Sequence, residues 1–198
     1  MKIILITGPS GSGKTTLGKS LINKLKHSHM LSTDDYYKTG IISQLLSKLI
    51  KSYFDKEISH DNYLLKKTIK KILKEKKIDH FYKYDFINKK NKIVYNEIPY
   101  IEYLIIEGIF TLELLDFIKR YNFLLINLKV NKNICMKRIC YRDQLERGKN
   151  KKKSIADFNN AWNLYKIKES NCKLTEKDKE IILNKNIDLN DILKKLTK

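Results

Sequence analysis

The sequence predicts an α/β fold, with a parallel β-sheet flanked by helices. Two observations support this prediction. Short aliphatic runs recur along the 198 residues, and helical patterns separate them. The run over residues 2–7 is nearly unbroken and is typical of a strand buried on both faces, and so is the run over 103–106. A third run over 123–130 repeats the alternation. The length fits one domain with a sizeable core.

A glycine-rich segment joins the first strand to a helical pattern. It fits the spacing G-x-x-x-x-G-K-[S/T] and comprises Gly8, Pro9, Ser10, Gly11, Ser12, Gly13, Lys14, Thr15 and Thr16. Between a strand and a helix, this pattern predicts a phosphate-binding loop. Its backbone N–H groups face the α- and β-phosphates, and the helix N-terminus favours negative charge. We expect Lys14 to reach the β- and γ-phosphates and the Thr15 hydroxyl to bind Mg²⁺.

Carboxylates stand where two further predicted strands end. Residues 29–33 lead into Asp34, and residues 103–106 lead into Glu107. Each has a plain alternative interpretation, Asp34 as a helix cap and Glu107 as the first residue of a loop. Because ligands bind at the carboxyl ends of parallel strands, we expect Glu107 to hold Mg²⁺ or its water. For the same reason we expect Asp34 to be a functional carboxylate that also lies near the metal.

The remaining patterns predict further helices and short strands. An apolar stripe over 42–53 predicts a helix with one apolar face. A helix over 65–73 is expected next, followed by short strands at 81–86 and 93–95 around a polar turn at 88–92. After these come a helix over 112–120, a helix capped by Asn131 and a flexible lysine-rich stretch to Lys153. The last expected elements are a helix opened by a Ser154–Asp157 capping box, a strand over 180–184 and a helix over 188–196.

Composition disfavours several classes of protein. The net charge is +19, yet lysines are scattered along every predicted surface helix, which disfavours a nucleic-acid binder. Three of the four arginines, Arg138, Arg142 and Arg147, fall within ten residues, as expected of a group that grips phosphate. No apolar run is long enough for a membrane span, and no signal peptide is apparent.

Cysteine usage favours a reducing compartment. Cys135, Cys140 and Cys172 are odd in number and lack metal-type spacing. We therefore expect reduced thiols in a cytoplasmic protein, with Cys135 and Cys140 on the packed side of their helix.

With these motifs in order, the chain resembles the uridine (uridine–cytidine) kinase family of P-loop kinases over nearly its whole length. The matching segments are Gly8–Thr16, Leu31–Lys38, Phe54-Asp55 with Asp61-Asn62, Tyr84-Asp85-Phe86, Ile105–Gly108 and Arg138–Lys149. The resemblance implies a single P-loop kinase domain over 1–198. It also implies a substrate-binding insertion at about 36–98 and a helical lid at about 138–156. The family includes tetramers, so a homo-oligomer is allowed.

The resemblance also implies an activity and residue roles. The activity is transfer of the γ-phosphate of ATP or GTP to the 5′-hydroxyl of uridine or cytidine, giving UMP or CMP in pyrimidine salvage, with Mg²⁺ as cofactor. Asp34 would orient the hydroxyl and accept its proton, and Asp55 would bind the ribose hydroxyls. Arg142 and Arg147 would close on the phosphoryl oxygens. The residues implied near the base or nucleoside are Tyr84, Phe86, Lys89 and Arg138.

Two departures from the family pattern keep other functions open. Lys89 stands where the family has a histidine that reads the pyrimidine edge, and Ile139 stands where a second arginine is expected. A lysine offers no hydrogen-bond acceptor to a base. The acceptor could therefore be a non-pyrimidine riboside such as nicotinamide riboside. The remaining alternatives are a nucleic-acid-associated P-loop NTPase, suggested by the charge, and a kinase relative that binds nucleotide without transferring phosphate.

Overall fold

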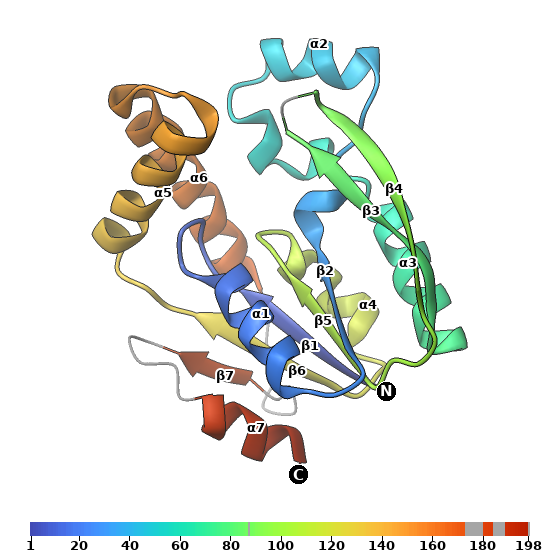
Figure 1. Cartoon of the computed structure of the whole chain (residues 1–198). Helices are drawn as coiled ribbons and strands as arrows, with labels where there is room; N and C mark the ends of the chain where they lie inside the picture. Colours follow the sequence, from blue (N-terminus) through green and yellow to red (C-terminus); the bar gives the residue numbers. More distant parts are fainter. Residues whose placement is uncertain (87, 173–179, 184–188, 198) are drawn as a thin grey trace.

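The computed structural model describes residues 1–86, 88–172, 180–183 and 189–197; residues 146, 147, 180–183, 195 and 197 are described by their backbone alone. Its centre is a sheet of five parallel strands in the order β2-β5-β1-β6-β7 (Figure 1). Their bounds are β1 Lys2–Thr7, β2 Ser28–Ser32, β5 Tyr103–Glu107, β6 Phe123–Leu128 and β7 Glu180–Leu183. The predicted α/β fold is confirmed.

Helices follow most strands and cover both faces of the sheet. Their bounds are α1 Lys14–Lys24, α2 Ile41–Leu49, α3 Asn62–Glu75, α4 Leu115–Ile118, α5 Lys132–Arg147, α6 Lys151–Asn171 and α7 Leu189–Thr197. Short 3₁₀ turns are η1 Thr33–Tyr36, η2 Tyr53–Asp55, η3 Glu57–Ser59 and η4 Thr111–Leu114.

The alternation of side chains along β1 explains the layers. Ile3 and Leu5 point to one face of the sheet and pack in a core with residues of α3 and α4. Ile4 and Ile6 point to the other face and pack with residues of α1 and α7. All four side chains are fully buried, as an unbroken aliphatic run in a central parallel strand predicts. The phosphate-loop segment therefore leaves the middle of a rigid sheet.

An antiparallel hairpin and α2 project beyond the sheet. Strands β3 (Ile78–Asp85) and β4 (Lys90–Ile98) form this hairpin, which is longer than the two short strands expected from the sequence. Figure 1 shows its turn beside α2, above the carboxyl edge of the sheet. The apolar stripe of α2 is largely exposed, with Ile41 85% and Ile42 75% exposed. Helix α2 extends from the core, so its stripe has no sheet to cover.

Helices α5 and α6 form a second projection. The predicted cap of α5 is confirmed, because the Asn131 side chain accepts a hydrogen bond from the Asn133 N–H. The predicted start of the next helix is wrong. Asn150 caps α6 by accepting from the Lys153 N–H, so the lysine-rich stretch is already helical from Lys151. Ser154 is buried inside this helix, where its hydroxyl donates to the Asn150 carbonyl.

Candidate active site

A cavity of about 990 Å³ opens at the carboxyl edge of the sheet, between the two projections. The loop between β1 and α1 forms its floor, with the ends of β2 and β5 beside it. The wall on the side of α2 and the hairpin is largely aromatic, with Tyr37, Tyr53 and Phe54 of η2, and Phe86 of the hairpin turn, whereas the wall from α5 and α6 is largely charged. This is the edge at which open α/β sheets bind ligands.

The phosphate-loop segment lies on this floor as the sequence predicts, and residues 10–16 line the cavity. The Lys14 ammonium is buried and donates to the carbonyl oxygens of Gly8 and Pro9, each at 3.0 Å. Burial lowers the pKa of Lys14, and the carboxylates of Glu107 and Asp34 oppose that shift. Gly11 permits helix α5 to pack on the loop, because a Cβ there would lie 2.6 Å from the Cys135 carbonyl oxygen.

Thr15, at the start of α1, and Glu107, at the end of β5, come together at the carboxyl edge of the sheet. The Thr15 hydroxyl donates to Glu107 Oε1 over 3.3 Å. Burial raises the pKa of Glu107, the Asp34 carboxylate raises it further, and Lys14 opposes both. A hydroxyl and carboxylate oxygens beside a phosphate loop are the ligand chemistry that Mg²⁺ takes in such sites. The residues present therefore fit this cation.

Asp34 lines the same cavity at the end of β2. Its Oδ1 is buried and has no hydrogen-bond partner among the described residues. Burial raises the pKa of this carboxyl; Lys14 lowers it and Asp35 raises it. The neighbouring carboxylate of Asp35 turns the other way, onto the hairpin, where it pairs with the Lys83 ammonium at 2.6 Å and accepts from the Tyr84 N–H at 3.1 Å. Of the two adjacent aspartates, Asp34 is the one free to meet a ligand.

The ends of β2 and β5 approach each other very closely. A Cβ on Gly108 would lie 1.8 Å from Thr33 Oγ1, and the φ of Gly108 is +142°. Only glycine fits this position without displacing Thr33. The glycine after the Glu107 strand therefore allows the side chain of Thr33, the residue before Asp34, to lie against it.

The wall from α2 and the hairpin carries most of the residues expected to bind an acceptor. Asp55 lies in η2, and burial, with help from Asp34 and Asp157, raises its pKa to about 6. Lys89 lies in the hairpin turn, with its ammonium 3.5 Å from Ser47 Oγ and 5.9 Å from the centre of the Phe54 ring. Phe86 also lines the cavity.

Tyr84 lies behind this wall. It is buried, and its ring packs against those of Tyr37 and Phe86 with centroids 5.2 and 5.0 Å apart. The cavity lining includes both of these neighbours but not Tyr84. Its position is that of a support for the aromatic wall.

The wall from α5 holds the expected arginines. Arg142 lines the cavity, and its guanidinium lies 3.5 Å from the buried carboxylate of Asp143. Arg138 also lines the cavity, and its guanidinium donates to the Gly11 carbonyl oxygen of the phosphate loop at 3.2 Å. Ile139, the next residue of α5, is buried. The side chain of Arg147 lies outside the described part of the structure.

Sequence reasoning did not single out several lining residues. Asp143 is 2% exposed and also pairs with the Lys149 ammonium at 3.6 Å, which in turn pairs with Asp157 at 2.9 Å. Lys149, Lys153 and Asp157 all face the cavity. Asp143, Lys149 and Lys153 fall within the segment that the sequence assigns to the lid, whereas the sequence pattern places Asp157 in a helix cap.

Within the described residues, no helix is long and apolar enough to cross a bilayer.

Comparison with solved structures identifies the fold. YFH7 from Saccharomyces cerevisiae superimposes with a TM-score of 0.73 at 9% identity, over 93% of each chain. D-glycerate 3-kinase from Cryptococcus neoformans var. grubii superimposes with a TM-score of 0.64 at 14% identity, over 92% of this chain and 85% of that one. At these identities the likeness shows the fold alone, which is the P-loop kinase fold.

Sequence relatives carry more information. A protein named uridine kinase from Borrelia turicatae is 40% identical over 109 residues, which span 55% of this chain and 52% of the relative. This chain therefore matches about half the length of that relative. Another uridine kinase, from Borrelia garinii subsp. bavariensis, is 30% identical over 174 residues, 85% of this chain and 81% of the relative. The model of the phosphoribulokinase/uridine kinase family matches residues 3–166. The chain belongs to the phosphoribulokinase/uridine kinase family.

Proposed function

We propose that this protein is a nucleoside kinase that transfers the γ-phosphoryl group of ATP or GTP to the 5′-hydroxyl of uridine or cytidine, giving UMP or CMP for cytoplasmic pyrimidine salvage. One observation supports this most strongly. Lys14 of the phosphate loop, Asp34 and Glu107 line the same cavity as Asp55 and an aromatic wall. Phosphate-binding groups and a carboxylate that can bind sugar hydroxyls thus line one cavity.

The chain's own residues have distinct tasks in this reaction. The loop amides and Lys14 hold the β- and γ-phosphates, and Arg142 neutralises the phosphoryl oxygens from the lid. Arg147 has the same proposed task. Asp34 orients the 5′-hydroxyl toward the γ-phosphorus and accepts its proton late in the transfer. Burial raises the pKa of Asp34 and makes it a stronger base than an exposed aspartate.

Mg²⁺ is the proposed cofactor, and Thr15, Glu107 and Asp34 are the residues that would hold it or its waters. When bound, it neutralises charge on the β- and γ-phosphate oxygens. Asp55 accepts hydrogen bonds from the ribose hydroxyls, and Phe86 packs against the base with Tyr84 behind it. The lid over about 138–156 excludes water, which would otherwise compete with the nucleoside.

Lys89 favours a neutral base over a cationic one. Its ammonium faces the cavity beside Phe54, where it can donate to a base carbonyl oxygen. The pyridinium ring of nicotinamide riboside carries a positive charge and would be repelled there. Uracil and cytosine each offer at least one carbonyl acceptor, which supports the pyrimidine assignment.

The test is a panel of nucleosides assayed for ADP release with Mg·ATP. We expect uridine and cytidine to be phosphorylated and nicotinamide riboside to be a poor acceptor. Failure of both pyrimidines would refute the assignment. Hydrolysis stimulated by polynucleotide and not by nucleoside would instead identify a nucleic-acid-associated NTPase, and nucleotide binding without transfer would identify an inactive relative.

A further inference from the structure

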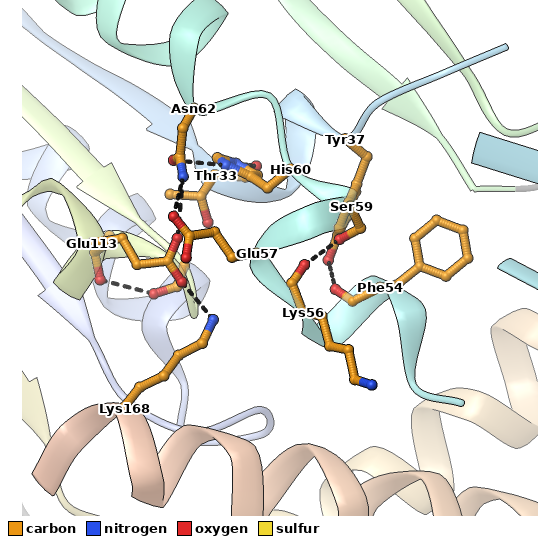
Figure 2. Close-up of polar contacts among 12 residues, drawn as sticks. Thr33, Tyr37, Phe54, Lys56, Glu57, Ser59, His60, Asn62, Glu113 and Lys168 are labelled. Atoms are coloured by element: carbon orange, nitrogen blue, oxygen red, sulfur yellow. Dashed lines mark hydrogen bonds and ion pairs between the residues drawn. The ribbon is translucent and has the colours of Figure 1, made fainter. Parts of the chain in front are cut away.

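His60 is a buried titratable residue that the proposed chemistry does not use. It lies between η3 and α3 and is 2% exposed. Its ring stacks on the buried ring of Phe110, with centroids 4.6 Å apart and planes inclined by 23°. Packing alone would suit any flat apolar ring at this position. The partners of its two nitrogen atoms point to a more specific task (Figure 2).

The first partner is the peptide that precedes Asp34. His60 Nε2 lies 2.8 Å from the carbonyl oxygen of Thr33. A carbonyl oxygen only accepts, so Nε2 carries the hydrogen and donates it. This carbonyl belongs to the peptide group that joins Thr33 to Asp34, and Gly108 lies against the side chain of Thr33. Hydrogen bonding and close packing therefore act on the same short segment.

The second partner is Asn62, the first residue of α3. His60 Nδ1 lies 3.0 Å from Asn62 Oδ1. Asn62 Nδ2 donates to carboxylate oxygens of Glu57 at 3.2 Å and of Glu113 at 3.3 Å. Because carboxylates only accept, the amide nitrogen must face them, and the amide oxygen, which also only accepts, is left to face His60 Nδ1. Nδ1 therefore donates as Nε2 does, and the ring that makes both hydrogen bonds carries two hydrogens and a positive charge. Burial lowers the pKa of His60, and the hydrogen bonds to Thr33 and Asn62 oppose that shift. The network thus fixes the orientation of the Asn62 amide.

Glu113 extends the network to helix α6. Its other oxygen pairs with the Lys168 ammonium at 2.5 Å, and this ammonium also lies 4.2 Å from the centre of the Phe110 ring. Helix α6 starts inside the proposed lid, and its residues Asp157 and Phe158 line the cavity. An unbroken set of polar contacts therefore runs from the lid-side helix to the peptide before Asp34, as Figure 2 shows.

We propose that His60 is a positioning residue for phosphoryl transfer: it holds the Thr33–Asp34 peptide in place and, through Asn62 and Glu113, couples that peptide to Lys168 on α6. The reaction it serves is the proposed one, so the kinetic part of this inference rests on the proposed function. The hydrogen bonds of His60 do not depend on the proposed function. The main chain of the His60 segment has its own anchor, because the Asp61 N–H donates to the Tyr36 carbonyl at 2.7 Å, so variants at position 60 keep their backbone attachment.

The first test compares His60→Phe with His60→Gln. Phenylalanine keeps a flat ring on Phe110 and loses both hydrogen bonds, whereas glutamine can restore a donor near the position of Nε2. We expect His60→Phe to lower kcat about 10- to 100-fold, the scale of a one-ångström misplacement, with ATP binding unchanged. His60→Gln should recover most of kcat. His80→Phe on the hairpin is the matched control, and wild-type kcat in a folded His60→Phe variant, or no recovery in His60→Gln, would overturn the role.

The second test measures coupling to α6. Lys168→Met removes the charge and keeps most of the bulk. Lys166→Met is its control, because it removes contacts of the ammonium with Glu169 and with the Trp162 ring, both on the same helix. We expect Lys168→Met to lower kcat in the wild-type background and to have little further effect beside His60→Phe. Independent, additive losses would overturn the coupling.

The third measurement does not depend on activity. Nitrogen-15 NMR of the four histidines should show ring N–H signals that exchange slowly with water and that are lost in His60→Phe. Rapid exchange of the His60 N–H would overturn the inferred hydrogen bond. A protected signal in a chain that phosphorylates no nucleoside would retain the bond and reject the proposed function instead.

Discussion

Thr15 and Glu107, 92 positions apart in the chain, are joined by a hydrogen bond of 3.3 Å. Each lies at the carboxyl edge of the sheet, one at the start of α1 and the other at the end of β5. Strands β1 and β5 pair in register with Ile6 opposite Glu107, and this pairing sets the approach of the two side chains. The pairing of strands in the sheet therefore brings this hydroxyl and this carboxylate together.

We predict that Glu107→Gln weakens Mg²⁺ binding, so that the enzyme needs a higher Mg²⁺ concentration. The amide keeps an acceptor for Thr15 but loses the negative charge, so the Mg²⁺ concentration for half-maximal rate should rise about 10- to 100-fold. The measurement is the rate of ADP formation against Mg²⁺ at saturating nucleoside. Glu102→Gln, an exposed position just before β5, is the control and should match the wild type. An unchanged Mg²⁺ dependence in Glu107→Gln would remove this residue from the metal site.

Asp34→Asn should abolish most of the turnover while nucleotide binding persists. Removal of the base and of the orienting carboxylate should cost at least about 10³-fold in kcat. Isothermal titration with a non-hydrolysable ATP analogue checks that binding is retained. Asp35→Asn is the matched control, and it should affect mainly stability because it weakens the contact with Lys83 on the hairpin. If Asp35→Asn were the slower enzyme, the assignment of the base would be reversed.

The pH profile of kcat should report the buried state of Asp34. Burial raises the pKa of this carboxyl above its ordinary value of 3.8, and only the deprotonated form accepts a proton. Activity should therefore fall as the pH drops through a pKa higher than that of an exposed aspartate. The acid limb of the pH profile is measured from rates of ADP formation in overlapping buffers at constant ionic strength. An acid limb at or below the ordinary aspartate pKa would contradict the burial argument.

Asp55→Asn should stabilise the fold at neutral pH while it weakens acceptor binding. The folded-state pKa of about 6 lies above the ordinary value of 3.8, so the folded chain binds more protons between these values and loses stability as the pH rises through them. The loss of folding stability caused by the charged carboxylate is fully present above pH 6 and absent below pH 3.8. Asparagine removes this loss, so the substitution should raise Tm more at pH 7 than at pH 4. Calorimetry at the two pH values measures the difference.

The same Asp55→Asn variant should raise KM for the nucleoside about 10- to 100-fold, because a charged hydrogen-bond partner of the ribose is lost. A lower Tm at pH 7 would contradict the electrostatic argument, and an unchanged KM would contradict the ribose assignment.

Gly108→Ala should damage activity through Thr33. A Cβ at this position would overlap Thr33 Oγ1, so the peptide before Asp34 must move. Gly40→Ala is the matched control, because Gly40 also has a positive φ, +96°, but has no atom within 4 Å of the added Cβ. We expect a larger fall in kcat for Gly108→Ala, with partial recovery when Thr33→Ala is added. Equal effects at the two glycines would show that backbone strain alone is responsible.

The parts that could be predicted from sequence depend on local pattern. Residues 2–16 predict strand, loop and helix because glycine spacing and aliphatic runs act over a few positions. Burial of Cys135 and Cys140 also follows from helical periodicity and is confirmed. The ends of strands at Asp34 and Glu107 are predictable for the same reason, whereas the roles of these two side chains stay predictions.

The rest depends on contacts between distant segments. The stripe on α2 has the period of a packed helix, yet nothing in that segment says that it projects from the sheet. Arg138 is on the expected helix, but its direction toward Gly11 depends on how α5 crosses the loop. The series of contacts that links Thr33, His60 with Asn62, Glu113 and Lys168 joins four segments, and no spacing within any of them predicts it.

Strand β1 has an implication for folding during synthesis. It pairs with β5 on one side and β6 on the other, and not with β2, which follows it in the chain. A growing chain therefore presents an unpaired strand with four consecutive aliphatic residues until residues 103–107 have left the ribosome. The hairpin β3–β4 and the segment from α2 to α3 must be made during that interval. Aggregation of the nascent chain should be governed by how fast β5 reaches its place, which makes translation speed over residues 28–102 a determinant of yield.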